Sequence, residues 1–154
     1  MRLKSYFKNE LSDPKPLLAQ TARRVRFEEV DGMGIVWHGR YASFLEDARI
    51  ELGDKWGIGY TDFLRHGYAI PIVRLTIDYI NPLRFNEDFT ITARLHFSKA
   101  ARINMSYTLE RGEELIATAA TVQLITSHSG ELVLAAPDFY YYFCLQWQAG
   151  LGMI

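Results

Sequence analysis

The stretch that decides the fold runs from Phe89 to Leu109 and reads FTITARLHFSKAARINMSYTL. From Phe89 to Phe97, apolar residues alternate with polar ones, and the same alternation resumes at Ile103 after a short connection around Lys99. Successive side chains of a β-strand point to opposite faces, so this pattern predicts two long, half-buried strands. Because only a few residues join them, the two strands must form an antiparallel hairpin.

Further strands are expected on both sides of this hairpin. They are predicted over 21–30, over 70–79 with a bulge between Ile72 and Val73, over 115–126, and as a short segment over 132–134. The 115–126 segment carries apolar residues on both faces, which places it inside the sheet rather than at an edge. The sequence therefore predicts a mainly antiparallel sheet of five to six strands.

One long helix precedes most of these strands. The apolar residues that recur there at helical spacing are Tyr41, Phe44, Leu45, Ala48 and Leu52, and they predict an amphipathic helix over 40–53. A further helical turn is expected within 57–68, and a short aromatic helix after Pro137. No second long helix shares the apolar stripe of the first, so the sheet must wrap around it. The predicted class is α+β, with one long helix and a short C-terminal helix.

Composition and charge fit a single globular domain. The chain has 154 residues, of which 49% are hydrophobic and 23% are charged, the usual balance of a folded domain. We divide it into an N-terminal arm over 1–20 and one domain over 21–154. The formal net charge of -1 gives no overall attraction to nucleic acid or to anionic lipid.

Cysteine usage and hydropathy indicate the compartment. Cys144 is the single cysteine and cannot form an internal disulfide, which favours a reducing environment. The first residues are too polar for a signal peptide, and no run approaches the ~20 apolar residues of a membrane span. We therefore expect a cytoplasmic protein that does not span a membrane.

The loop between the first strand and the long helix is the candidate site. Asp31 is followed by two glycines, one of them Gly34, which leave little side-chain bulk around the carboxylate. The backbone amides of His38, Gly39 and Arg40 fall at the helix start, where unpaired N–H groups favour negative charge. A carboxylate beside such donors suits acyl transfer, in which a base or nucleophile attacks a carbonyl and donors hold the oxyanion.

Other interpretations of this loop stay open. Asp31 can simply begin a turn, and His38 can pack or cap. A dinucleotide-binding fingerprint is disfavoured, because Trp37 stands where a third glycine is required. The four histidines have no second ligand at a familiar spacing, so we expect no metal and no cofactor. The arginines at the start of the first strand fall on both of its faces, which is typical of a solvated surface rather than of a nucleic-acid site.

The same residues resemble a known family. The run Arg24–Val25, then Val30–Asp31, then 34–38 and Tyr41 resembles the signature of the 4-hydroxybenzoyl-CoA thioesterase family within the hot-dog acyl-CoA thioesterases. The similarity continues through 44–49 and 71–73. The resemblance implies the hot-dog fold, a helix wrapped by an antiparallel sheet, which the periodicity predicts independently. It also places the catalytic aspartate of the family at Asp31.

The resemblance implies a thioesterase that hydrolyses an acyl-CoA, or an acyl group on a carrier protein. Asp31 would act as nucleophile or general base, and the helix-start amides as the oxyanion hole. The residues expected to bind substrate are Gly34, His38, Gly39 and Tyr41. A non-catalytic acyl-binding module and a dehydratase of the same fold are the alternatives. Glu46 is a second acid near the site, for which pairing with Arg49 is the simpler account.

Local cations are expected to meet the phosphates of CoA, since the overall charge offers no long-range attraction. The candidates are Arg40, Arg84, Lys99 and Arg102.

The chain is also expected to be a homo-oligomer, a dimer or a tetramer. A single sheet around one helix leaves an edge strand and an open face bearing residues such as Thr90, Thr92 and His96. The resemblance adds that hot-dog proteins pair with their active sites at the shared interface.

Overall fold

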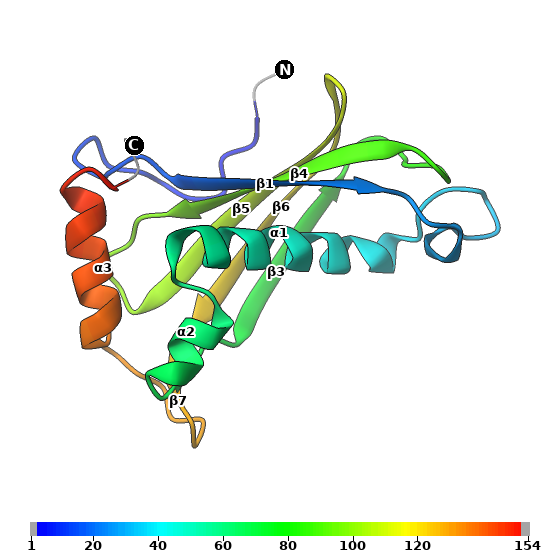
Figure 1. The fold of residues 1–154 in the computed structure, drawn as a ribbon. Coiled ribbons are helices and arrows are strands. Elements are labelled where there is room, and N and C mark those ends of the chain that lie inside the picture. Colours follow the sequence, from blue (N-terminus) through cyan, green and yellow to red (C-terminus); the bar gives the residue numbers. More distant parts are fainter. Residues whose placement is uncertain (1–2, 152–154) are drawn as a thin grey trace.

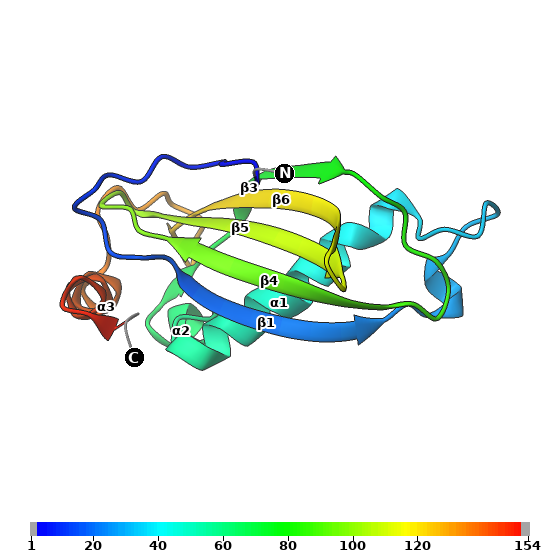
Figure 2. The same cartoon turned by 90° about the horizontal axis from the view of Figure 1, so that it is seen from above.

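A computed structural model describes residues 3–151 and shows a five-stranded antiparallel sheet (Figures 1 and 2). The strand order is β1-β4-β5-β6-β3. The strands are β1 (Leu17–Arg24), β3 (Ile72–Tyr79), β4 (Asp88–His96), β5 (Arg102–Arg111) and β6 (Glu114–Leu124). A separate two-stranded ribbon consists of β2 (Tyr68–Ala69) and β7 (Thr126–Ser127).

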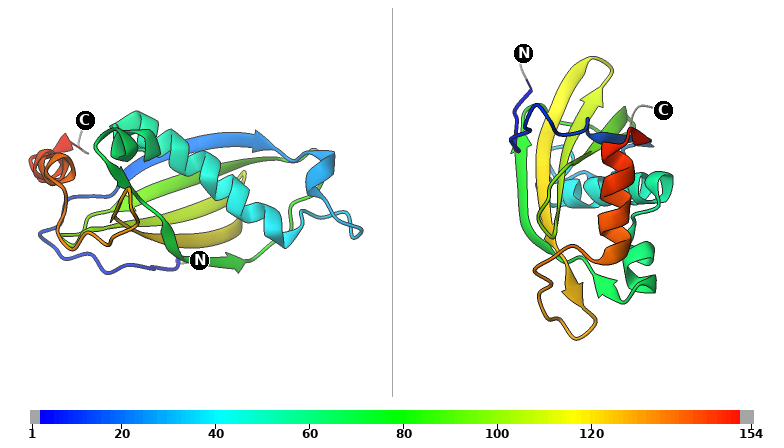
Figure 3. Two further views of the ribbon diagram at one scale, coloured as in Figure 1. Left: turned by 90° about the horizontal axis from the view of Figure 1, so that it is seen from below. Right: turned by 90° about the vertical axis from the view of Figure 1, so that its left-hand side faces the viewer.

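The long helix α1 (Tyr41–Trp56) lies across one face of this sheet (Figure 3). Its residues Phe44 and Ala48 are fully buried, as are Ile91 and Leu95 on the sheet face beneath. The helix ends at Gly57, whose positive φ of 73° suits glycine. The prediction of a long helix covered by the sheet, made from the helical stripe and the strand alternation, is therefore confirmed.

Two shorter helices complete the fold. The helix α2 (Tyr60–Arg65) follows α1, and α3 (Asp138–Gln148) stands at the end of the sheet where β4 connects to β5 (Figure 1). Trp147 of α3 packs edge-on against Phe97, with ring centres 5.3 Å apart. Its indole N–H donates to the carbonyl of Lys15 at 2.9 Å, so α3 also holds the N-terminal arm.

Most of the predicted elements are confirmed. The hairpin of β4 and β5 pairs Leu95 with Met105, and β6 is hydrogen-bonded on both sides. The predicted bulge is present, because the register of β3 shifts between Ile72 and Arg74.

Two predicted strands are wrong in extent. The first strand begins at Leu17, inside the range assigned to the arm, and ends at Arg24 instead of residue 30. It ends there because Arg24 faces Asp88, the first residue of β4, so no partner strand continues beyond it. Residues 27–29 form a 3-10 turn instead. The segment 132–134 makes only an isolated bridge, between Leu132 and Thr126.

The outer face of the sheet, away from α1, is less open than predicted. Arm residues cross it beside β3 and β6, where the Tyr6 hydroxyl bonds to the Asp78 carboxylate and lies 2.7 Å from the Thr118 hydroxyl. The ring of Phe7 packs on His96, with centres 5.1 Å apart. Thr92 is buried, so the prediction that it lies on an open face is wrong. Within residues 3–151 we find no helix with the length and apolarity needed to cross a membrane.

Candidate active site

The loop that carries Asp31 closes on itself at one end of the sheet. Val30 bridges to Val36 across its neck, and the N–H of Asp31 donates to the carbonyl of Ile35 at 2.8 Å. Ile35 also bridges to Arg84 in the connection between β3 and β4. The loop is therefore held both by its own backbone and by a segment about 50 residues away in the sequence.

The carboxylate of Asp31 is half-buried and stands at the start of a tight turn. One oxygen, Oδ1, accepts the backbone N–H of Met33 at 2.8 Å, and the carbonyl of Asp31 accepts the N–H of Gly34 at 3.0 Å. Gly34 has a φ of 77°, a conformation that side chains with a Cβ rarely adopt. Among residues 3–151, no lysine or arginine forms an ion pair with Asp31. The carboxylate is therefore fixed in direction without being neutralised.

The start of α1 lies beside this carboxylate. A 3-10 turn, His38–Arg40, leads directly into the helix, and no side chain of the described chain caps either element. Backbone N–H groups at a helix start have no partner within the helix, so they are available to an oxygen of a ligand. The expectation that Arg40 contributes its amide is wrong, because this N–H donates to the carbonyl of Trp37 at 2.9 Å, which leaves the N–H groups of His38 and Gly39 as the donors. A Cβ on Gly39 would come within 2.4 Å of the Trp37 ring, so a larger residue here would require the ring to shift.

Two tyrosines form the wall between the helix start and the sheet. Tyr79, near the end of β3, donates its hydroxyl to the carbonyl of His38 at 2.8 Å. Its ring stands edge-on to that of Tyr41, with centres 4.9 Å apart. Burial raises the pKa of Tyr41 to about 12, so its phenol stays protonated at neutral pH.

These groups surround a cavity of about 280 Å³. Its lining is mostly apolar, with Asp31, His38, Tyr41 and Asn81 among its few polar residues. The lining residues are Asp31, Met33, Ile35, Val36, His38, Tyr41, Tyr79, Ile80, Asn81 and Pro82. An apolar cleft with a small number of polar groups is the usual form of a small-molecule site.

The structure thus brings Asp31, His38 and Tyr41 together, with Gly34 and Gly39 in the adjoining backbone. The sequence did not point to the far wall, which comes from Tyr79, Asn81 and Pro82. In the sequence, the pair Asn81–Pro82 signals only the end of the strand predicted over 70–79. These residues line the cavity together with the Asp31 loop, from which they are some 45 residues distant in the chain, and local periodicity carries no signal for such a meeting.

The four cations proposed for the CoA phosphates do not converge within one chain. Arg84 bridges to Ile35 of the Asp31 loop, and Arg40 lies at the start of α1, where it donates to the carbonyl of Glu28 at 3.4 Å. Lys99 and Arg102 lie at the opposite end of β4 and β5, where Lys99 faces α3. The prediction that all four cations lie around the entrance of one site is therefore wrong for Lys99 and Arg102 within a single chain.

Glu46 pairs with Arg49, as the spacing predicted, and Arg49 is buried with its guanidinium 4.5 Å from the ring centre of Tyr60. Neither residue lines the Asp31 cavity. The part of the chain that the structure describes holds no group of three or more His, Cys, Asp or Glu side chains placed to bind a metal ion.

Comparisons with known proteins agree with this geometry. The model of the thioesterase-like superfamily matches residues 25–143, which is most of the chain. An acyl-acyl carrier protein thioesterase of Arabidopsis thaliana is 35% identical over 80 residues, 52% of this chain and 42% of that protein. A putative acyl-CoA thioesterase of Bacillus subtilis is 38% identical over 63 residues, 41% of this chain and 46% of that protein. The matched part is thus less than half of each relative.

A solved structure of a hypothetical protein from Thermus thermophilus superposes with a TM-score of 0.73 at 30% sequence identity. The superposition covers 83% of this chain and 98% of the other, so the two proteins share the fold nearly throughout. The chain therefore belongs to the thioesterase-like superfamily and is, by family, a thioester hydrolase with the hot-dog fold.

Proposed function

We propose that this protein hydrolyses an acyl thioester of CoA, or of an acyl carrier protein, with Asp31 as its catalytic residue. The observation that carries the proposal is that the Asp31 carboxylate and the uncapped start of α1 face one cavity. A carbonyl placed between them would have an attacking group on one side and N–H donors for its oxygen on the other.

In the general-base route, Asp31 takes a proton from water while the water oxygen attacks the thioester carbon. The backbone N–H groups of His38 and Gly39 hold the resulting oxyanion, since the Arg40 N–H is bonded to the Trp37 carbonyl. When the carbon–sulfur bond breaks, the protonated Asp31 returns its proton to the leaving thiolate. In the nucleophilic route, an oxygen of Asp31 attacks the carbon directly, the thiolate leaves, and water then hydrolyses the mixed anhydride.

The polar groups around the cavity have matching roles. With its carbonyl held by Tyr79, His38 has a fixed backbone, which keeps the helix-start donors in place. Tyr41, whose phenol stays protonated at neutral pH, lines the same cavity and adds no negative charge to it. Gly34 permits the tight turn of the loop, and Gly39 leaves room for the Trp37 ring beside the helix start.

Asp31→Asn tests this proposal, because it removes the charge and keeps the shape. We expect the release of free thiol from acyl-CoA to fall by at least about 10³-fold, as losses of catalytic groups do. Asp54→Asn, which changes an exposed carboxylate further along α1, serves as the control. Near-normal turnover by the Asp31 variant would remove this residue from the mechanism. A wild-type protein that binds acyl thioesters without hydrolysing them would favour the acyl-binding module instead, and hydration or dehydration of the acyl chain would favour a dehydratase.

For the substrate class, we place the chain near the 4-hydroxybenzoyl-CoA thioesterases within its superfamily, on the strength of the Asp31 motif. The named relatives include both a putative acyl-CoA thioesterase and an acyl carrier protein thioesterase, so both carriers belong in the assay.

Arg40 and Arg84 are the proposed contacts of the CoA phosphates, since they lie at the same end of the sheet as Asp31. Replacing both by Gln should raise KM for acyl-CoA and leave KM for acyl-pantetheine, which lacks the nucleotide phosphates, unchanged. The cytoplasmic location remains a prediction from the sequence.

We further propose that the protein forms a homo-oligomer through β3, one of the two edge strands. Large apolar side chains on and just after this strand are 43–55% exposed: Ile72, Val73, Leu75, Tyr79 and Ile80. An exposed apolar edge strand has unpaired backbone groups and tends to pair with a strand of another chain. Because Tyr79 and Ile80 also line the Asp31 cavity, a second copy seated on β3 would lie next to the active site.

A further inference from the structure

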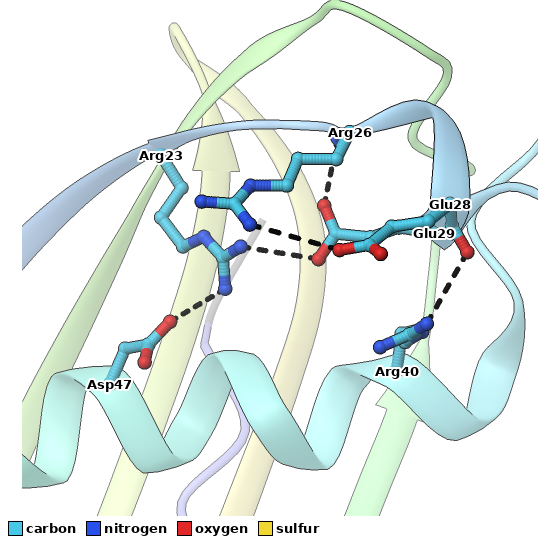
Figure 4. A network of polar contacts seen from close by, with 6 residues as sticks. All are labelled: Arg23, Arg26, Glu28, Glu29, Arg40 and Asp47. Carbon is cyan, nitrogen blue, oxygen red and sulfur yellow. Dashed lines mark hydrogen bonds and ion pairs between the residues drawn. The ribbon is translucent and has the colours of Figure 1, made fainter.

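A chain of ion pairs joins β1, the turn before the Asp31 loop and α1 (Figure 4). Arg23, at the end of β1, donates through Nη1 to Asp47 of α1 at 2.6 Å and through Nη2 to Glu29 at 3.2 Å. Its guanidinium carbon also lies 4.9 Å from the ring centre of Phe44. One arginine thus connects the strand, the turn and the helix.

Glu29 is the buried member of this network, with only 4% of its surface exposed. Each of its carboxylate oxygens has a donor, Oε2 from Arg23 and Oε1 from the backbone N–H of Arg26 at 2.8 Å. A buried carboxylate is costly unless it is paired and hydrogen-bonded, so the side chain has little freedom to move. Glu29 takes no direct part in the proposed reaction.

The backbone of Glu29 lies at the neck of the Asp31 loop. Its carbonyl accepts the N–H of Trp37 at 2.9 Å, directly before the 3-10 turn His38–Arg40. Asp31 follows Glu29 by two residues, and its own N–H closes the loop on Ile35. A shift of Glu29 would therefore move the attacking carboxylate and the oxyanion donors relative to each other.

The outer part of the network contributes less. Arg26 lies 3.7 Å from the carboxylate of Glu28, and both side chains are exposed. Arg40 reaches only the carbonyl of Glu28, at 3.4 Å. Exposed pairs of this kind contribute little to stability, so positional control rests on Arg23, Glu29 and Asp47.

We propose that Glu29 and Arg23 are positioning residues, which set the distance between the Asp31 carboxylate and the start of α1. This inference rests on the proposed function of Asp31. Catalysis by placed groups is sensitive to such distances, and a misplacement of about 1 Å can cost on the order of 10²-fold in rate. Substrate binding in the apolar cavity depends much less on them.

The decisive variant is Glu29→Gln, which keeps an acceptor for the Arg26 N–H and removes the charge that holds Arg23. We expect kcat to fall about 10- to 100-fold while KM changes less than about 2-fold. Asp47→Asn breaks the network from its more exposed end, so a smaller fall in kcat with the same unchanged KM is expected. Asp88→Asn is the matched control, because it breaks the Arg24–Asp88 pair at the same end of the sheet, where both side chains are more than 60% exposed.

A double-mutant cycle separates positioning from a general loss of structure. If Glu29 acts through Asp31, Glu29→Gln should not lower further the residual thiol release of the Asp31→Asn protein. Equal losses in both backgrounds, a rise in KM alone, or the same loss in Asp88→Asn would overturn the inference. Should Glu29→Gln fail to fold, an Asp47→Asn protein with wild-type kcat would overturn it as well. If Asp31→Asn retains full turnover, the proposed function fails instead, and that single variant identifies this case.

Discussion

At the scale of single residues, the hydrogen bond between Tyr79 and His38 joins β3 to the turn before α1 at the candidate site. Tyr79→Phe removes only the hydroxyl that the His38 carbonyl accepts. A hydrogen bond of this kind contributes about 1 kcal/mol, so we expect kcat to fall about 3- to 10-fold. Thermal unfolding should change little, because half of the Tyr79 side chain is exposed. Steady-state kinetics beside a melting curve measures both effects, and a loss of stability without a loss of kcat would contradict the role given to this contact.

At the same scale, part of the candidate site could be predicted from the sequence. Asp31 and the helix start are neighbours in the chain, so their proximity could be predicted. Arg23 and Glu29 have the same parity as Val25, a core residue. An arginine and a glutamate on the apolar face of a predicted strand are thus a signal of a buried ion pair. The interpretation of the arginine cluster as a solvated surface is wrong for Arg23, whose side chain is 20% exposed and pairs with Glu29.

At the scale of elements, periodicity predicted what is regular. The hairpin of β4 and β5 and the helix α1 follow from alternation and helical spacing, because those patterns match single faces of single elements. The end of β1 could not be predicted in this way, since it is set by where β4 begins. The same holds for the cavity wall formed by Asn81 and Pro82, which lies in the connection that bridges to the Asp31 loop through Arg84.

The exposed edge of β3 gives the prediction that belongs to this scale. Replacing Val73 and Leu75 by Lys should prevent edge-to-edge pairing, because charged lysines are among the devices that keep edge strands apart. Light scattering should then give 17.7 kDa, the mass of one chain, and at least twice that for the unchanged protein. Leu64→Lys, a change of similar exposure on α2, is the control. An oligomer that survives the β3 changes would place the interface elsewhere.

At the scale of the whole molecule, the outer face of the sheet makes stability depend on pH. His96 packs between Phe7 and the sheet, and its Nε2 lies 2.7 Å from the Ser106 hydroxyl. Burial, together with the charge of Arg94, lowers the pKa of His96 to about 4. Between the ordinary pKa of about 6.5 and this value, the unfolded chain binds more protons than the folded one. The free energy of unfolding must therefore decrease as the pH falls through this window.

The size of this effect can be isolated with one variant. Because His96 is only partly buried, we expect it to contribute roughly 1–2 kcal/mol between pH 7 and pH 4.5. Urea unfolding of the wild type and of His96→Gln at both pH values measures it, and the wild type should lose more stability on acidification. His128→Gln, at an exposed position, controls for the loss of a histidine. Parallel pH curves for the wild type and His96→Gln would show that His96 does not titrate in this way.

The strand order also has a consequence for how the chain assembles over time. The strands β4, β5 and β6 are consecutive and joined by short turns. In contrast, β1 pairs with β4, which lies about 70 residues later in the sequence. Closing a long loop costs entropy before any contact offsets it, so local pairings form early and distant ones late. The Asp31 loop is attached to β1 on one side and to the segment after β3 on the other. Both edges of the sheet must therefore dock before the loop is complete, and catalytic competence should be among the last properties that a refolding chain acquires.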